Sequence, residues 1–331
     1  MQSGLFTAIY AALIAFTANL IIGPLVMPYL RRIKAGQNVR EDGPKSHLSK
    51  AGTLTMGGVI IIFSFCAGAL FYLRGNTQGL MIMFAMAGFG LVGFLDDYIK
   101  LVKKRSLGLR AYQKIIGQLA VTAVFVAYLW LADPMIFGSG ISRVLIPFTN
   151  GLVINLGPLY IPFAFFVIIG CVNGVNITDG LDGLACGVTL LVTVFLVFCA
   201  AASRSPILPV LGAGAGALMG FLLFNAYPAK VFMGDTGSLA LGGFVAASAI
   251  LLKMPLFLVI IGIIYVTETL SVFLQVSYFK LTGGRRLFKM APIHHSFELS
   301  GWHETRVVTL FYVITAVACL VGFLGARFIF E

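Results

Sequence analysis

Two adjacent aspartates, Asp96 and Asp97, stand at the end of a long apolar stretch, and Lys100 follows within one helical turn. On a helix this spacing places the lysine on the same face as the carboxylates. Neighbouring carboxylates can bind Mg²⁺ or accept a proton, and a lysine beside them can hold a phosphate. A salt bridge at the end of an ordinary helix would give the same pattern, so this motif leaves both interpretations open.

A second polar cluster contains Asn173, Asn176, Asp179 and Asp182 together with several glycines, and it lacks lysine and arginine. Glycines allow backbone N–H groups to approach a ligand closely. Amide and carboxylate side chains can bind a nucleobase edge, a ribose or a metal. A turn-rich loop is the alternative, but a loop that only sets membrane orientation would be expected to carry basic residues. The cluster therefore favours a binding site.

The third cluster runs from Asn225 to Ser238 and includes Phe232 and Asp235 just before an apolar segment. Glycines and hydroxyls at a helix N-terminus suit phosphate, and Asp235 suits Mg²⁺, which takes few carboxylates and adds phosphate oxygens. Phe232 could stack on a base, although a single aromatic more often packs against lipid or core. The segment lacks the Gly-Lys-Ser/Thr of a P-loop, so that class of nucleotide site is excluded.

The fourth cluster is Pro-Ile-His294-His295-Ser-Phe-Glu298. On a helix, His294 and Glu298 would be neighbours one turn apart. Two adjacent histidines do not match the usual spacing of helical zinc sites. Contact with phosphate or proton handling is therefore the favoured role, and zinc the weaker alternative.

Lys50 and Glu268 are two further polar residues outside the four clusters. Lys50 precedes a glycine- and threonine-rich stretch that includes Thr55. It is either a loop lysine that sets orientation or a substrate contact. Glu268 lies in the middle of an apolar segment, where a charge should face the bundle interior and find a partner. Packing at a helix break and a role in transport remain equal alternatives for Glu268, and we do not place it in the site.

The composition indicates the elements that must position these residues. Of 331 residues, 59% are apolar and 11% are charged, which is typical of a protein embedded in lipid. The long, continuously apolar runs favour membrane helices over a β-barrel, whose spans alternate apolar and polar residues. The sequence predicts an all-α integral membrane protein with a single polytopic catalytic domain over residues 1–331. Ten apolar segments are predicted at about 5–30, 53–73, 77–98, 113–132, 159–173, 183–203, 207–226, 238–252, 255–279 and 306–329.

The charges predict the orientation of these segments. Loops on one side carry 18 of the 23 lysines and arginines, which makes that side cytoplasmic and places both termini outside. The net charge of +11 is explained in this way, without nucleic acid. Nine of the twelve acids and all four histidines fall on the same side. Because acids contribute little to orientation, their gathering predicts an active site at the cytoplasmic face.

Two other features predict local structure. Residues 133–160 contain Asn150-Gly151 between apolar runs, which indicates a small external β-hairpin without a catalytic part. Gly212, Gly214 and Gly216 alternate with alanines, and such small residues let helices approach closely.

The chain resembles the phospho-N-acetylmuramoyl-pentapeptide transferase family in four motifs and in their order along the sequence. The motifs are LDDYIK, NxxNxTDGLDGL, NxxPAxVFMGDTGS and PIHHSFE. That family belongs to the polyprenyl-phosphate N-acetylhexosamine-1-phosphate transferase superfamily. The resemblance covers essentially the whole chain. It implies a multi-pass enzyme of the bacterial plasma membrane that transfers phospho-MurNAc-pentapeptide from its UDP carrier to undecaprenyl phosphate. The products are lipid I, for peptidoglycan synthesis, and UMP.

The resemblance also implies roles for individual residues. Asp96 and Asp97 match the catalytic pair, and Asp235 matches the Mg²⁺ ligand. Gly180, Leu181 and Asp182 match the contacts to uracil, with Phe232 stacking on the ring. The remaining catalytic and substrate-binding matches are Lys50, Thr55, Lys100, Asn173, Asn176, Asp179, Asn225, Gln275, His294, His295 and Glu298. The family is dimeric and is inhibited by uridine-based nucleoside antibiotics.

Two positions depart from the family pattern. Ser296 stands where many relatives have a third histidine, which puts any role of such a histidine in doubt here. Leu54 stands where many have proline. Neither position affects the acids.

Rival functions are a transferase of GlcNAc-1-phosphate, a transporter and a lipid-binding scaffold. The PIHHSFE region favours the muramoyl branch over the first. Transporters place their sites near the midplane, often between internal repeats, whereas here the polar clusters lie at one face and no repeat is visible. A scaffold would not need the acids. The sequence leaves open whether the lipid phosphate attacks directly or an aspartate first forms a covalent intermediate.

Overall fold

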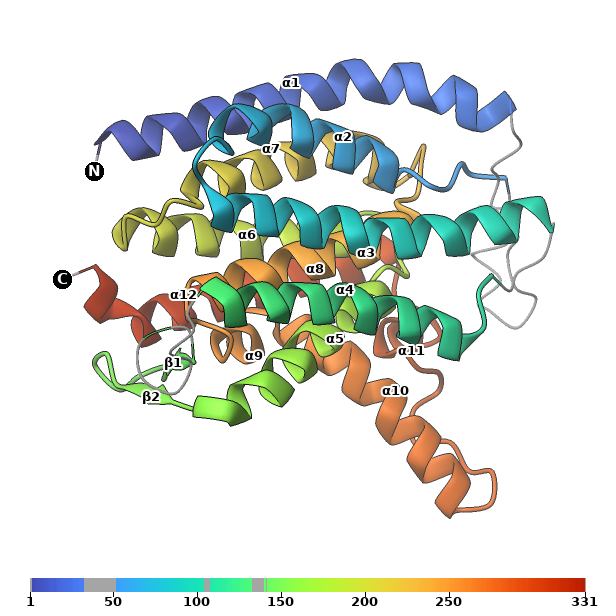
Figure 1. Cartoon of the computed structure of the whole chain (residues 1–331). Coiled ribbons are helices and arrows are strands. Elements are labelled where there is room, and N and C mark those ends of the chain that lie inside the picture. The colour runs from blue at the N-terminus through green and yellow to red at the C-terminus, as the bar shows by residue number, and fades with distance from the viewer. Residues whose placement is uncertain (1, 33–51, 104–107, 133–139, 141, 331) are drawn as a thin grey trace.

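The computed structural model describes residues 2–32, 52–103, 108–132, 140 and 142–330 of the chain. Most of these residues are helical (Figure 1). The helices are α1 (Gln2–Arg32), α2 (Gly58–Ala69), α3 (Thr77–Val102), α4 (Ala111–Ala132), α5 (Tyr160–Thr178), α6 (Leu184–Ala202), α7 (Leu208–Asn225), α8 (Gly234–Leu251), α9 (Phe257–Ile261), α10 (Ile263–Leu281), α11 (Ile293–Glu298) and α12 (Glu304–Gly325). Single 3-10 turns cover Leu70–Tyr72, Gly157–Leu159 and Arg327–Ile329, and the strands are β1 (Arg143–Leu145) and β2 (Val153–Asn155).

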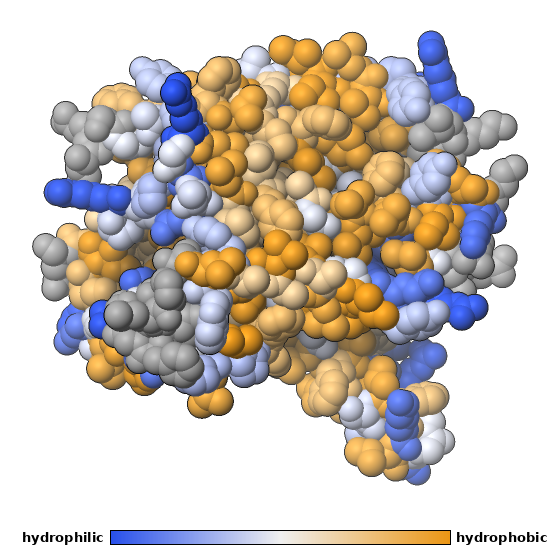
Figure 2. All heavy atoms as spheres, viewed as in Figure 1, coloured by the Kyte–Doolittle hydropathy of each residue, from blue (hydrophilic) through white to orange (hydrophobic). Residues whose placement is uncertain are grey.

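Eight of the helices in the described ranges are long and apolar enough to cross a membrane: α1, α3 to α8, and α12. Apolar residues cover the middle of the face seen in Figure 2, and hydrophilic residues gather towards its two ends. An apolar belt between two polar rims is the surface of a multi-pass membrane protein. The predicted helical membrane architecture is therefore confirmed.

The other two predicted segments differ from single long helices. The second forms a shorter apolar helix over Gly58–Tyr72. The ninth is broken at Gly262, which separates α9 from α10. A Cβ at Gly262 would lie 2.6 Å from the Leu258 carbonyl oxygen, so the chain turns tightly there. After the break, α10 leans out of the bundle (Figure 1).

Helix α8 forms the centre of the bundle and packs against α2, α3 and α5. Nearly all of its residues are buried, and most of them are glycine, alanine or serine. Small side chains let neighbouring helices approach closely in a membrane. The predicted close approach at the glycines of α7 is also found, because a Cβ at Gly212 or Gly216 would collide with the backbone of α1 at Ala8 or Ala12.

The predicted hairpin forms, with β1 and β2 antiparallel and Val144 opposite Ile154. Its connection spans residues 146–152, longer than a two-residue turn, and both Asn150 and Gly151 have positive φ. The Arg327 guanidinium donates to the Asn150 side-chain oxygen at 2.7 Å, which joins the hairpin to the C-terminal segment. Both termini and the hairpin lie at the same end of the bundle (Figure 1).

Candidate functional site

Three aspartates from two helices meet at one point. Asp96 and Asp97 lie near the end of α3, and Asp235 is in the first turn of α8. One carboxylate oxygen from each lies within 4.8 Å of the others, which is close enough for a shared metal ion. Asp96 and Asp97 are buried, and the Asp235 side chain is 17% exposed. Residues far apart in the sequence therefore form one anionic cluster, which we call the aspartate cluster.

Packing between α3 and α8 brings these side chains together. Gly93 lies against the backbone of Asp235, where any Cβ would collide. One turn later, Asp97 accepts hydrogen bonds from the Thr236 backbone N–H at 2.9 Å and the Thr236 hydroxyl at 2.7 Å. A carboxylate at the start of a helix satisfies free N–H groups and complements the helix dipole. Asp97 thus fixes the start of α8, and with it Asp235.

Two lysines neutralise much of the negative charge. The Lys100 ammonium lies 2.6 Å from Asp96 and 2.9 Å from Asp235. The Lys114 ammonium, from α4, lies 3.0 Å from the same Asp235 oxygen and 3.1 Å from the Asn176 amide oxygen. If all five groups are counted as charged, the three carboxylates and two ammonium groups have a formal net charge of −1.

This donor set fits a divalent cation. Carboxylate oxygens are the ligands of hard cations such as Mg²⁺, and the cluster already attracts two cationic side chains. The same lysines are placed to bind phosphate oxygens once a metal takes over part of the carboxylate charge. The arrangement therefore suits a phosphate ester that arrives with a metal ion.

Asn176 ties α5 to the aspartate cluster. Its side-chain NH₂ donates to Asp235 at 2.8 Å and to the Ser238 hydroxyl at 2.8 Å. Asn173, one turn earlier, instead donates to the Gln118 side-chain oxygen of α4 at 2.8 Å. The predicted cluster in α5 thus divides into one residue at the aspartates and one that joins two helices.

The loop between α5 and α6 comprises residues 179–183 and lies beside the cluster. The Asp182 carboxylate accepts from the Ala229 backbone N–H at 2.9 Å, and the Asp182 N–H donates to Glu304 at 2.6 Å. These bonds connect the loop to the segment before α8 and to α12. Burial, followed by the negative charges of Asp235, Asp97 and Asp182, raises the pKa of Asp179 well above its usual value.

A short parallel pairing supports the segment before α8. Leu54 bridges to Val231, and the Phe232 N–H donates to the Leu54 carbonyl at 2.7 Å. Thr55 follows this bridge, and its hydroxyl lies near Gly234. Asn225 is buried and donates to the Val231 carbonyl at 3.0 Å, which holds the same segment from the other side. These contacts hold in place the segment that leads into Asp235.

The two histidines of α11 pair with different glutamates. His295 Nδ1 lies 2.9 Å from Glu298 of the same short helix. His294 Nδ1 lies 3.0 Å from Glu268 of α10. The segment therefore forms a short helix, in which His295 contacts Glu298 and His294 contacts Glu268 of the neighbouring helix. His294 is the buried member, and its ring lies against Gly180 of the 179–183 loop.

The predicted residue Gln275 makes its contacts away from the aspartates. Gln275 accepts from the backbone N–H groups of Leu287 and Phe288 at 3.1 and 2.8 Å, so it holds the chain that returns from the end of α10. Lys50 lies outside the described residues.

Comparison with known proteins gives the family of this fold and site. Residues 79–253 match the glycosyl transferase family 4. Proteins named phospho-N-acetylmuramoyl-pentapeptide-transferase are similar over almost the full chain. One from Clostridium kluyveri is 51% identical over 97% of this chain and 100% of its own length. Others are from Acetivibrio thermocellus, 51% identical over 96% and 95%, and from Clostridioides difficile, 50% identical over 98% and 99%.

The chain belongs to glycosyl transferase family 4. Its family-matched region runs from α3 to just beyond α8 and contains the whole aspartate cluster. The glutamate and histidines of α10 and α11 lie beyond it, in the part covered by the full-length relatives. The resemblance inferred from the four motifs is thus confirmed.

The sequence did not identify Lys114 as a site residue, and it did not place Glu268 in the site. Lys114 is one of the 18 basic residues that predict the orientation, and it contacts both Asp235 and Asn176. Its signal was weak, because a lysine near the start of a membrane helix is common. Glu268 did give a signal, since a carboxylate inside an apolar segment requires a partner, and His294 is that partner.

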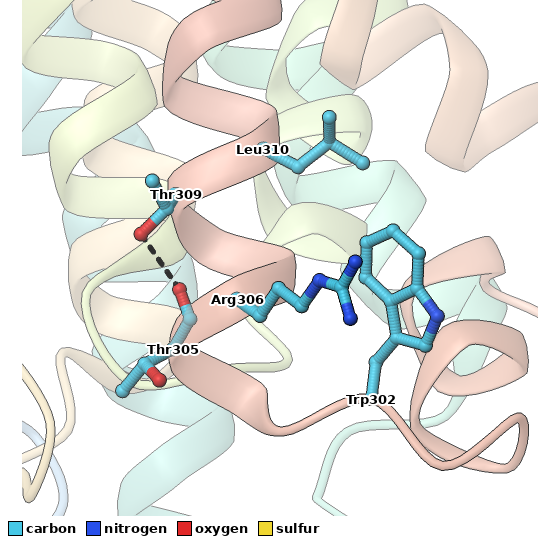
Figure 3. Close-up of a pocket in the computed structure, with 5 residues that line it drawn as sticks. All are labelled: Trp302, Thr305, Arg306, Thr309 and Leu310. Carbon is cyan, nitrogen blue, oxygen red and sulfur yellow. Dashed lines mark hydrogen bonds between the residues drawn. The ribbon is translucent and has the colours of Figure 1, made fainter.

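A shallow pocket of about 460 Å³ lies at the start of α12, and none of the three aspartates lines it. Figure 3 shows its lining, where the Arg306 guanidinium lies 4.0 Å from the centre of the Trp302 ring. Thr305, Thr309 and Leu310 complete it. A tryptophan and an arginine at a helix end are typical membrane-interface anchors, and we assign the pocket no chemistry.

Proposed function

We propose that this chain transfers phospho-MurNAc-pentapeptide from UDP-MurNAc-pentapeptide to undecaprenyl phosphate, forming lipid I and releasing UMP. The observation that carries the proposal is the aspartate cluster with its two lysines, in a membrane helix bundle. Relatives that are about half identical over nearly their full length carry the name of this activity. The relatives' name favours the muramoyl donor over UDP-GlcNAc.

The site residues match the demands of phosphoryl transfer. Such reactions depend mainly on positioning and on neutralising charge. Asp235 would hold Mg²⁺, with Asp96 and Asp97 within reach. When bound, the ion neutralises the diphosphate and polarises its phosphoryl oxygens. Lys100 and Lys114 would bind phosphate oxygens of the donor and acceptor.

The two adjacent aspartates differ in the contacts they make. Asp97 is engaged at the start of α8, where it accepts hydrogen bonds from Thr236. Among the described residues, Asp96 accepts a hydrogen bond from the Leu109 backbone N–H at 2.8 Å and pairs with Lys100, and the start of α8 does not hold it in this way. Asp96 is therefore the better candidate to accept a proton. A phosphate monoester has a second pKa near ~6 and is largely ionised at neutral pH, so we favour direct attack by the lipid phosphate.

The 179–183 loop and Phe232 would receive the uridine of the donor. Basic loops at the end that carries the site favour a cytoplasmic active site and external termini. By the same resemblance, we propose that the chain works as a homodimer in the bacterial plasma membrane. Uridine-based nucleoside antibiotics would then compete with the donor.

The test is UMP release by the purified chain with Mg²⁺ and undecaprenyl phosphate. UDP-MurNAc-pentapeptide and UDP-GlcNAc are offered separately, with an EDTA arm. We expect release from the muramoyl donor only, and none with EDTA. Release from UDP-GlcNAc alone would move the chain to the sister activity, and no release from either by folded protein would refute the proposal.

A second arm separates the two routes. The donor is supplied without undecaprenyl phosphate, and the protein is examined for a sugar-phosphate attached to Asp96 or Asp97. Direct attack predicts no UMP burst and no adduct. A stoichiometric burst with an aspartyl adduct would establish the covalent route instead.

A further inference from the structure

Glu268 and His294 form a buried pair next to the predicted nucleotide loop. Glu268 has no exposed surface and the His294 side chain is 1% exposed. His294 Nδ1 lies 3.0 Å from one Glu268 oxygen. Within the described part of the chain, the other Glu268 oxygen and His294 Nε2 have no hydrogen-bond partner. A buried polar atom without a partner is costly and calls for an explanation.

The orientation of the ring supplies that explanation. A Cβ built on Gly180 would collide with His294 at Nε2, so this nitrogen faces the 179–183 loop at close range. Gly180 leaves the space that the ring occupies. The unpaired nitrogen is therefore held beside the residues that match the uracil contacts.

The carboxylate determines which nitrogen remains for a ligand. With Glu268 ionised, its carboxylate could only accept a hydrogen bond, and Nδ1 of His294 would be the donor. The partner of one ring nitrogen sets the role of the other. Helix α10 begins after the break at Gly262 and leans out of the bundle (Figure 1). Glu268 lies on this helix and contacts His294 of α11.

We propose that Glu268 is a positioning residue for His294, holding its Nδ1–H so that Nε2 contacts the uridine nucleotide on the 179–183 loop. This role rests on the proposed function, because the donor supplies the nucleotide. Glu268 itself does not touch the nucleotide. The neighbouring pair, His295 with Glu298, is partly exposed and provides a matched control.

The first experiment observes the histidine nitrogens directly. The chain has four histidines, so ¹⁵N-histidine labelling gives a short spectrum that single His→Gln variants assign. We expect the wild-type His294 signal to show a protonated Nδ1. The two rings are in contact, with centroids 4.1 Å apart, so the readout is the protonation of each Nδ1 rather than small shifts. Glu268→Gln should change the Nδ1 protonation of His294 more than that of His295, and Glu298→Gln should do the reverse. An unprotonated Nδ1 in the wild type would overturn the proposal without any variant.

The second experiment is a double-mutant cycle on UMP binding, with UMP affinity measured by calorimetry. Loss of the outer partner of a metal-binding histidine costs about 10–100-fold in metal affinity or activity. Taking the lower end of that range for a histidine that binds a nucleotide, we expect Glu268→Gln to weaken UMP binding about tenfold. In a His294→Ala background the same change should have no further effect. Independent losses that add would mean that Glu268 acts structurally, and would overturn the proposal.

The outcomes separate this inference from the proposed function. If neither UDP-sugar is turned over while UMP binding follows the cycle, the proposed reaction fails and the positioning role stands. If lipid I forms but the two substitutions add independently, the reaction stands and the positioning role fails.

Discussion

The aspartate cluster and the Glu268–His294 pair solve the same problem, a carboxylate within a membrane protein, in different ways. Asp235 has two lysines and Asn176 as partners and keeps 17% of its side chain exposed. Glu268 has one histidine and no exposed surface. The first arrangement has interchangeable cationic partners, whereas the second has one fixed partner.

This difference separates binding from positioning. A carboxylate whose ammonium partners can be replaced by a metal or moved to phosphate is suited to a changing charge during a reaction. A fully buried pair cannot exchange partners with solvent and instead fixes one geometry. Substitutions should therefore affect metal dependence in the cluster and nucleotide affinity in the pair.

The largest expected effect is that of Asp235→Asn. Losing the ligand that both lysines and Asn176 surround should lower kcat by about 10³-fold, because metal stabilisation of a phosphoryl transition state is worth several kcal/mol. UMP release across a Mg²⁺ titration measures this. Glu268→Gln, assayed alongside, should leave the Mg²⁺ requirement unchanged. If Asp235→Asn retained activity within tenfold, the cluster would not be the metal site.

Lys114→Gln tests whether the lysine missed in the sequence belongs to the cluster. A hydrogen bond to a charged group contributes about 1.5–3 kcal/mol, so kcat/KM should fall roughly 10–100-fold. Because a competing cation is removed, less Mg²⁺ should be needed for half-maximal rate. Lys103→Gln, an exposed lysine at the end of α3, is the matched control and should resemble the wild type. Equal loss in both variants would indicate a general effect of surface charge.

Gly93→Ala tests the packing that assembles the cluster. The added Cβ would collide with the Asp235 backbone, and such overpacking costs about 1–3 kcal/mol. We expect a lower thermal unfolding temperature and a lower rate of UMP release. Gly170→Ala is the control, because nothing lies within 4 Å of its new Cβ. If both variants behaved alike, close approach of α3 and α8 would not be needed.

Much of this arrangement follows from the sequence, because apolar run length predicts membrane helices and four polar motifs interrupt them. The gathering of Asp96, Asp97 and Asp235 at one end followed from the alternation of loops across the membrane. The hairpin followed from Asn150-Gly151. These are local or topological signals that a single sequence carries.

Contacts between distant segments could not be read in the same way. The hydrogen bond between Asp97 and Thr236 depends on the position of α3 along the axis of α8. The close contact of Gly93 with Asp235 fixes that position, and this contact becomes visible only in the folded structure. The break at Gly262 begins α10, and Glu268 on this helix contacts His294 of α11, a contact that the sequence did not predict. A sequence shows that Glu268 needs a partner, but the fold chooses which one.

Asp179 joins the two regions, and its substitution has the smallest expected effect. It lies in the loop that His294 contacts, and burial followed by the charges of Asp235, Asp97 and Asp182 raises its pKa. A raised folded pKa means that ionised Asp179 destabilises the fold. Near or below the unfolded value of about 3.9 the carboxyl is protonated in both states, and the penalty grows as pH rises above it.

Asp179→Asn removes this titration, so we expect the variant to unfold at a higher temperature than the wild type at pH 8. The difference should shrink towards zero near pH 4. Thermal unfolding of both proteins in EDTA without nucleotide measures it. The opposite result is a variant that unfolds below the wild type at pH 8 and matches it near pH 4. That result would mean that ionised Asp179 stabilises the loop. The negative charge of the aspartate cluster would then not disfavour ionisation of Asp179 in the loop beside His294.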